Sequence, residues 1–220
     1  MILAVTGGKG GVGKSTVAYN LGAELDAVVV DADLGMADLP PGHGPDLHDV
    51  LAGRATPRDA IDDSGDVTLV PCGRSLNGAR AADPTNLGSV VRALEAEFGE
   101  VVIDCPAGLA SDAGVPLYVA DCCLIVTTAE PPALADGVRT RALARKLGTG
   151  LCGVTLNRSG ERAPTDRVAR LFGAPVVSLP ETRAAQVAFD ASVAVKAVEP
   201  NGAFATQVRK VAKLVHSCTA

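Results

Sequence analysis

The amino-acid sequence predicts an α/β fold: a three-layer α/β/α sandwich around a mostly parallel sheet of roughly seven or eight strands. Two observations support this prediction. Short apolar runs, each with the length of a strand buried on both faces, alternate along the chain with segments of helical periodicity. A glycine-rich loop also links the first apolar run to the first helical segment, which is the arrangement of P-loop nucleotide-binding folds.

Seven apolar runs predict the strands, and apolar residues at three- and four-residue spacing predict helices between them. The predicted strands are residues 1–6, 27–31, 67–71, 101–104, 122–127, 151–157 and 175–179. The predicted helices are residues 16–25, 84–98, 114–120, 132–147, 165–172 and 203–216, with two short ones at 47–51 and 58–61. Because no repeat, low-complexity tract or long linker interrupts this order, we expect one domain over residues 1–220.

Composition excludes several classes of function. The net charge of −5 and the 3% aromatic content argue against a strongly basic nucleic-acid surface and base-stacking platforms, so DNA is a less expected partner. The six cysteines form no C-x-x-C pair, which argues against a disulfide framework, a zinc site or an iron–sulfur cluster. With no charged-then-apolar leader and no apolar run near 18 residues, we expect a cytoplasmic protein with reduced thiols.

Residues 8–15 match the phosphate-binding pattern G-x-x-x-x-G-K-[ST]. Its glycines let backbone N–H groups surround an anion, and the following helix adds the positive end of its dipole. Lys14 is expected to reach the β- and γ-phosphates, and the Ser15 hydroxyl to bind Mg²⁺. The expected nucleotide-binding residues of this loop are Gly8, Lys9, Gly10, Gly11, Val12, Gly13, Lys14, Ser15 and Thr16.

Three aspartates stand at strand ends. Asp31 and Asp33 follow the second predicted strand, and Asp104 ends the fourth in a segment with the form of a Walker B motif. Ligands of parallel sheets bind beyond the carboxyl ends of the strands, so we expect all three carboxylates to converge on Lys14 and Ser15. An isolated aspartate in this position often only caps a turn, but three of them beside a phosphate loop favour a Mg²⁺ site.

On these residues the chain resembles the deviant-Walker-A ATPases, the MinD/ParA group, over nearly its whole length. Residues 9–16 are similar to the signature loop of the group, residues 30–35 to its switch I and residues 103–108 to its switch II. The form D-x-D-x-G, followed later by D-x-P-A-G, is nearer to MinD than to ParA. Residues 71–76 and 82–84 are similar to a segment of archaeal MinD-like proteins.

The resemblance implies roles for individual residues. Lys9 would reach across a dimer interface to phosphates bound by the other subunit, as an arginine finger supplied in trans does. Asp33 would position the attacking water, and Asp31 and Asp104 would hold Mg²⁺ through waters. The adenine contacts would come from Asn157, Arg158, Pro180 and Glu181.

The implied function is a slow, partner-stimulated ATPase that uses ATP/ADP and Mg²⁺, dimerises on ATP binding, and positions the division site or another cellular structure. Three alternatives remain: a ParA-like partitioning ATPase, a nucleotide-binding adaptor with little turnover, and a metallocluster-assembly or metabolic P-loop enzyme. An activating protein partner and peripheral contact with the inner face of the cell membrane are also implied. Residues 128–132 reorder the N-P-E typical of MinD.

Three further features have two interpretations each. The apolar stripe Phe204, Val208, Val211 and Val215 of the helix at 203–216 suits either a membrane-targeting segment or core packing, and the lack of a leucine-rich, aromatic face favours the core. His43 and His48 are too few for a metal site, and we expect both to be exposed. The basic cluster at 139–146 suits a weak DNA or partner patch, but a solvated helix face is commoner.

Overall fold

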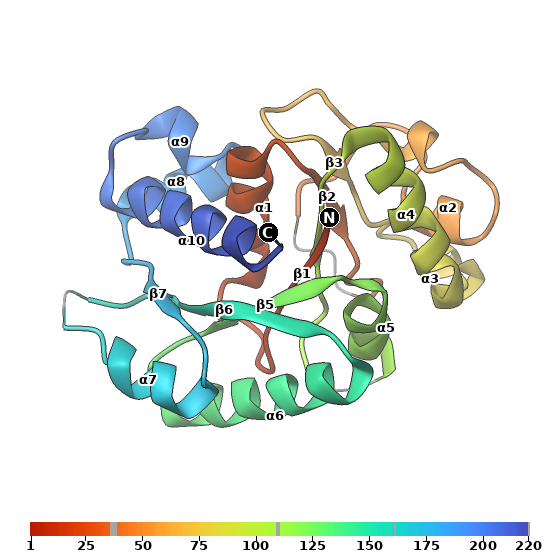
Figure 1. Cartoon of the computed structure of the whole chain (residues 1–220). Helices are drawn as coiled ribbons and strands as arrows, with labels where there is room; N and C mark the ends of the chain where they lie inside the picture. Colours follow the sequence, from red (N-terminus) through yellow and green to blue (C-terminus); the bar gives the residue numbers. More distant parts are fainter. Residues whose placement is uncertain (36–38, 109–110, 161, 220) are drawn as a thin grey trace.

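A seven-stranded, all-parallel sheet organises the molecule (Figure 1). The computed structural model describes residues 1–35, 39–108, 111–160 and 162–219. The strand order is β3-β2-β4-β1-β5-β6-β7. The strands are β1 (Ile2–Thr6), β2 (Val28–Asp31), β3 (Leu69–Val70), β4 (Val101–Asp104), β5 (Cys122–Thr127), β6 (Gly150–Leu156) and β7 (Val176–Ser178).

The central strand is β1, which pairs with β4 on one side and β5 on the other. Its side chains alternate between the two faces of the sheet: Leu3 and Val5 belong to one apolar cluster, Ile2 and Ala4 to the other. All five β1 residues are buried, because helices cover both faces of this strand. The carboxyl end of β1 therefore opens at the middle of the sheet edge, with β4 and β5 beside it.

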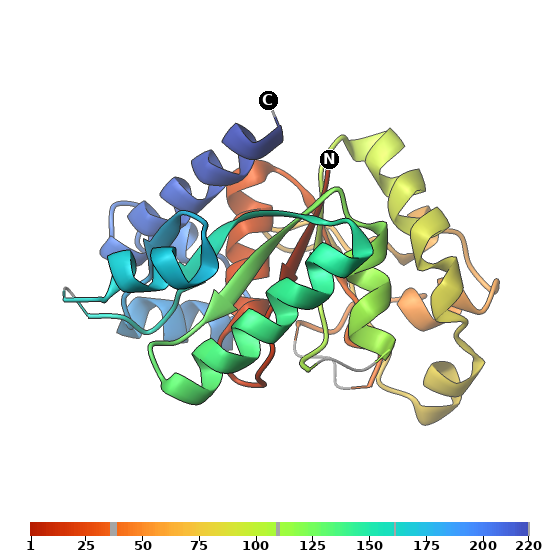
Figure 2. The ribbon, with the colours of Figure 1, turned by 60° about the horizontal axis from the view of Figure 1, so that its bottom comes forward.

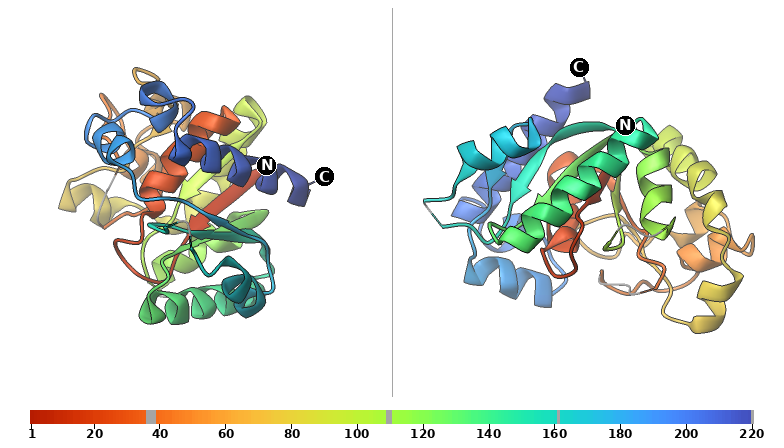
Figure 3. Two further views of the ribbon diagram at one scale, coloured as in Figure 1. Left: turned by 90° about the vertical axis from the view of Figure 1, so that its left-hand side faces the viewer. Right: turned by 90° about the horizontal axis from the view of Figure 1, so that it is seen from below.

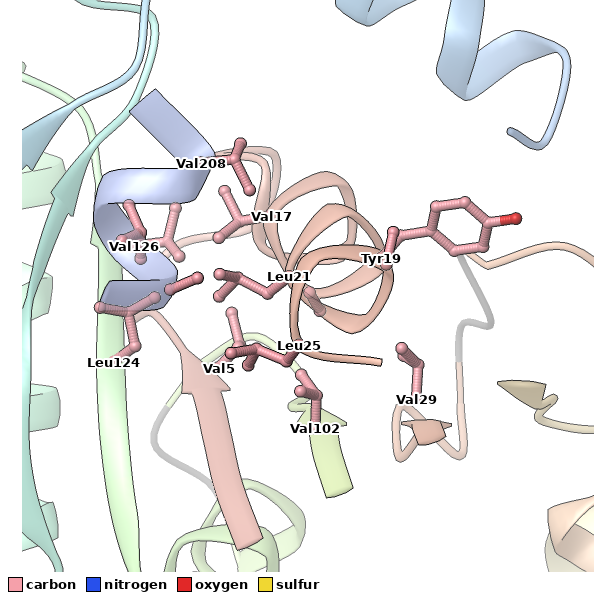
Figure 4. Packing of buried hydrophobic residues seen from close by; sticks show 14 of the residues in the cluster. Val5, Val17, Tyr19, Leu21, Leu25, Val29, Val102, Leu124, Val126 and Val208 are labelled. Carbon is pink, nitrogen blue, oxygen red and sulfur yellow. The ribbon is translucent and has the colours of Figure 1, made fainter. Parts of the chain in front are cut away.

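One face of the sheet is covered by α1 (Lys14–Leu25) and α10 (Ala203–Thr219), with α8 (Arg183–Asp190) and α9 (Val195–Val198) beside them (Figure 1). Figure 4 shows Val17, Leu21 and Leu25 of α1 on the side of the helix that meets the strands and α10. This confirms the apolar face predicted for the first helix, which begins two residues earlier than expected, at Lys14.

The opposite face is covered by α4 (Leu87–Phe98), α5 (Ser111–Val119), α6 (Pro131–Leu147) and α7 (Thr165–Phe172). Figure 2 brings α6 forward over the strands, and the left-hand view of Figure 3 shows α6 and α7 on the side of the sheet away from α10. With helices on both faces, the predicted three-layer α/β/α sandwich is confirmed.

Between β2 and α4, the described residues form four short helical elements: α2 (Leu47–Leu51), η1 (Arg58–Ala60), α3 (Leu76–Ala81) and η2 (Pro84–Asn86). The start of α2 is fixed by a capping box, in which the Asp46 side chain accepts from the Asp49 N–H and the Asp49 side chain from the Asp46 N–H. The expected short helix at 58–61 is a 3₁₀ turn, and η2 replaces the first turn expected of α4. The strand expected at 67–71 is shorter, because only Leu69 and Val70 pair with β2.

The apolar stripe of α10 is part of the core. Phe204, Val208, Val211 and Val215 are each at most 2% exposed and pack in the cluster that contains α1. Lys210 and Lys213 face solvent. In this structure the stripe therefore packs as the core-packing interpretation of the helix expects. No helix in the described ranges is long and apolar enough to cross a membrane.

Replacing Val211 with aspartate is expected to destabilise the fold by about 4 kcal/mol, because it buries an unpaired carboxylate against α1. The neighbouring substitution Lys210→Asp, on the exposed side, is expected to change stability by about 0.5 kcal/mol or less. Urea denaturation midpoints of the two variants give the comparison. Equal stabilities would mean that this side of α10 leaves the core in solution.

Candidate functional site

The glycine-rich loop between β1 and α1 forms a cradle for an anion. The backbone takes positive φ at Gly11 (75°) and at Gly13 (94°), where glycine is favoured. Gly13 also leaves no room for a side chain, since an added Cβ would overlap the Asn157 amide. As the residue before α1, Gly13 offers no capping side chain, so the first N–H groups of the helix are open to an anion.

The two lysines of the loop lie in different environments. Lys14, the first residue after the glycine-rich loop, is buried, with 6% of its surface exposed. The Lys9 side chain is 44% exposed, and its Nζ lies 3.0 Å from Oε2 of Glu130, a side chain that is itself 65% exposed. Lys14 is therefore enclosed within its own loop, whereas Lys9 stands at the rim of the loop with a solvent-exposed partner.

Asp31 and Asp104 converge on the phosphate loop, as predicted. They are register partners at the ends of β2 and β4, and each is 1% exposed. The Ser15 hydroxyl lies close enough to the Asp104 carboxylate to lower its pKa. Burial, together with the nearby charges of Asp31 and Asp33, raises the pKa of Asp104 to about 8 even though Ser15 and Lys14 oppose the shift.

This pair and Ser15 fit a magnesium ion. Asp104 Oδ1 is buried and has no hydrogen-bond partner among the described residues, and carboxylate and hydroxyl oxygens are the ligands that Mg²⁺ prefers. The described part of the chain contains no group of three or more His, Cys, Asp or Glu side chains that could hold a metal ion. Mg²⁺ keeps several waters and takes few protein ligands beside substrate phosphates.

Asp33 lies two residues beyond β2, on the loop that leaves the sheet beside the aspartate pair. Its N–H donates to Asp31 Oδ1 at 3.2 Å, and its charge contributes to the raised pKa of Asp104. The structure therefore places Asp33 next to the candidate metal ligands. The predicted switch I segment is described through Gly35, and residues 36–38 lie outside the described ranges.

A pocket of about 180 Å³ lies beside the start of α1. The four residues expected to contact adenine, Asn157, Arg158, Pro180 and Glu181, line it together with Gly13 and Thr16 of the phosphate loop. Asn157 links the two regions, since its Nδ2 donates to the Val12 carbonyl at 2.9 Å and its backbone N–H to Thr127 at 2.8 Å. A nucleotide with phosphates in the loop would meet this pocket with its base.

One part of the pocket lining was not predicted from the sequence. Gln186 and Phe189 of α8 line the pocket, and no helix was expected at this position. Thr182 followed by an alanine-rich segment could have predicted the start of this helix. In the structure Thr182 is the N-cap, and its side chain accepts a hydrogen bond from the Ala185 N–H. Glu130, the partner of Lys9, was also missed, because the two residues are 121 positions apart.

Comparisons with known proteins agree with this geometry. The family model described as the CobQ/CobB/MinD/ParA nucleotide binding domain matches residues 3–191. An uncharacterized ATP-binding protein of Methanocaldococcus jannaschii is 32% identical, over 84% of this chain and 83% of the relative. The chain also superposes on the cell division ATPase MinD of Pyrococcus furiosus with a TM-score of 0.90 and 31% identity, covering 99% of this chain and 98% of that one.

A second solved structure is the septum site-determining protein MinD of Pyrococcus horikoshii, complexed with Mg-ADP. It superposes with a TM-score of 0.91 and 29% identity, covering 100% of this chain and 97% of that chain. The likeness therefore extends over nearly the whole length of both solved structures.

Proposed function

The chain belongs to the CobQ/CobB/MinD/ParA family of nucleotide-binding domains, and we propose that residues 1–220 form a MinD-like ATPase that dimerises when it binds Mg-ATP. The observation that supports this most strongly is the unequal placement of the two loop lysines. Lys14 is buried within its own loop, while Lys9 is exposed at the rim. A lysine at the rim can complete the site of a second copy of the chain, which makes hydrolysis depend on association.

Each residue of the site has a separate task in this proposal. The N–H groups at the start of α1 and the Lys14 ammonium hold the β- and γ-phosphates. Ser15, Asp31 and Asp104 would hold Mg²⁺, which would neutralise the negative charge that develops on the phosphates. Asp33 orients the attacking water, and Lys9 of the second copy stabilises charge on the transferred phosphoryl group. The pocket of Asn157, Arg158, Pro180 and Glu181 holds adenine.

Replacing Asp33 with alanine is expected to lower the ATP turnover number by about a hundredfold, because the attacking water loses its positioning group. Affinity for ATP is expected to stay within about threefold, since Asp33 is not part of the phosphate loop or the adenine pocket. Single-turnover hydrolysis and binding of a fluorescent ATP analogue measure the two quantities. Asp63→Ala, at an exposed position of the same inter-strand region, is the matched control, and unchanged turnover in D33A would remove Asp33 from this role.

The cellular task we propose is spatial positioning of the division site or another structure, as the likeness to the two MinD proteins suggests. Turnover would be slow and raised by a protein partner. Sedimentation with anionic liposomes, in the presence of ATP or ADP, tests peripheral membrane contact. ATP-dependent sedimentation would support a MinD-like cycle. An ATP-dependent shift of DNA would instead favour a ParA-like partitioning ATPase, and absence of turnover with both would favour an adaptor.

A further inference from the structure

His48 is a buried histidine, contrary to the exposed position expected from the sequence. It is the second residue of α2 and is 2% exposed. Its companion His43 is exposed as expected, with 90% of its side chain accessible. Histidine is an expensive residue to bury, because both ring nitrogens need hydrogen-bond partners. The contacts of the His48 ring therefore indicate what it does.

The Nε2 atom of His48 lies 3.1 Å from the backbone carbonyl oxygen of Leu34. A carbonyl oxygen can only accept, so the ring carries its hydrogen on Nε2 and donates it to Leu34. Leu34 directly follows Asp33, the residue proposed to orient the attacking water. His48 thus ties α2 to the backbone unit next to that carboxylate.

Among the described residues, contacts of two kinds hold the loop that carries Asp33. At its start, the Asp33 N–H donates to Asp31 Oδ1 at 3.2 Å, and the Leu34 N–H donates to the Ala32 carbonyl at 3.0 Å. Both contacts are local and come from the turn itself. Beyond them, the His48 contact with Leu34 comes from another element, 14 residues away.

Two glycines and a cysteine lie close to the ring. A Cβ added at Gly73 would lie 2.5 Å from Nδ1 of His48, and one added at Gly78 would lie 2.9 Å from the same atom. Both glycines therefore lie against the Nδ1 side of the ring, where a larger residue would collide with it. The buried Cys72 sulfur lies 3.4 Å from Nε2, where it can accept from the same N–H.

The other ring nitrogen, Nδ1, does not bond to a neighbouring segment of the described residues as Nε2 does. Nδ1 is buried and without a hydrogen-bond partner among the residues described, a cost that an apolar side chain would avoid. A leucine would fill the space without that cost. What the histidine adds to this position is the Nε2–H that reaches Leu34.

We propose that His48 is a positioning residue for ATP hydrolysis, whose Nε2–H bond to the Leu34 carbonyl holds the Asp33 loop in the orientation that activates water. This inference rests on the proposed function. Since neither His48 nor Leu34 lies in the phosphate loop or lines the adenine pocket, the contact acts on the turnover number and not on nucleotide affinity.

Two variants separate positioning from simple packing. His48→Leu removes the donor and is expected to lower the turnover number about tenfold to a hundredfold, with the Kd for a fluorescent ATP analogue within about threefold of the unaltered chain. His48→Gln keeps a nitrogen donor the same number of bonds from Cα, and is expected to recover turnover to within about threefold. His43→Leu, at the exposed histidine of the same segment, is the control and is expected to leave turnover unchanged.

Amide hydrogen exchange of the peptide that contains Asp33 and Leu34 gives a readout that needs no activity. In the nucleotide-free chain, His48→Leu is expected to speed this exchange and His48→Gln to restore its rate. The inference is overturned if H48L turns over ATP at the normal rate, or if H48Q and H48L lose turnover and exchange protection equally. If the unaltered chain shows no Asp33-dependent hydrolysis, the proposed function fails instead, and the inference with it.

Discussion

Replacing Lys9 with alanine is expected to lower ATP turnover about a thousandfold, the size of effect that a cationic residue supplied in trans has on phosphoryl transfer. The affinity of the K9A monomer for ATP is expected to stay within about fivefold of that of the unaltered chain. Lys9 is exposed, and its ion pair with Glu130 is a surface pair worth about 1 kcal/mol or less. Lys14→Ala, in contrast, is expected to abolish binding, since this buried lysine serves its own loop.

The Lys9 experiment combines light scattering with hydrolysis. The unaltered chain with a non-hydrolysable ATP analogue is expected to double its mass, and K9A to remain a monomer that still binds the analogue. Lys146→Ala, at an exposed lysine on α6, controls for loss of a surface charge. A chain that stays monomeric with bound ATP, and hydrolyses it at the same rate without Lys9, would refute the dimerisation proposal.

Stability of the chain without Mg²⁺ and nucleotide is expected to fall as the pH rises from about 4 to about 8, by an amount on the order of 5 kcal/mol. The cause is Asp104, whose pKa is raised from 3.8 to about 8 by burial and by the neighbouring aspartates. A raised folded-state pKa means that the folded chain binds the proton more tightly than the unfolded chain. The contribution is thus complete below pH 4 and is lost as the pH passes through this window.

Denaturant midpoints over this pH range check the Asp104 prediction. Asp104→Asn carries no charge at any pH, so it is expected to remove most of the slope and to stabilise the nucleotide-free chain at pH 8, while weakening its response to Mg-ADP. Asp63→Asn, at an exposed position, is expected to leave the slope intact. A D104N chain with an undiminished slope would assign the pH dependence to other groups.

The central strands were predictable because each is a continuous apolar run that needs no distant information. Val28, Val29 and Val30 form such a run, and so do Val101, Val102 and Ile103. The helices α3, α8 and α9, of four to eight residues, were not predicted from the sequence. Their formation depends on caps such as Ser75 and Thr182.

The residues of the candidate site likewise fall into those that could be predicted from the sequence and those that could not. Lys14, Ser15 and Asp104 could be placed together from the sequence because parallel strands all present their carboxyl ends at one edge. The position of Phe189 in the wall of the proposed adenine pocket could not be predicted, because this residue belongs to α8, a helix that the sequence did not predict. The burial of His48 was mispredicted for a related reason: Gly73 and Gly78, which lie against its ring, come from other parts of the chain.

The strand order carries a consequence for biosynthesis. β1 and the phosphate loop are made first, but the neighbours of β1 in the sheet begin only at Val101 and Cys122, and α10, which packs with α1, follows every strand. A nascent chain that ends before Ala203 therefore exposes Val17 and Leu21 to water and to chaperones. The capacity to bind ATP is expected to arise late in translation, in one step with closure of the core.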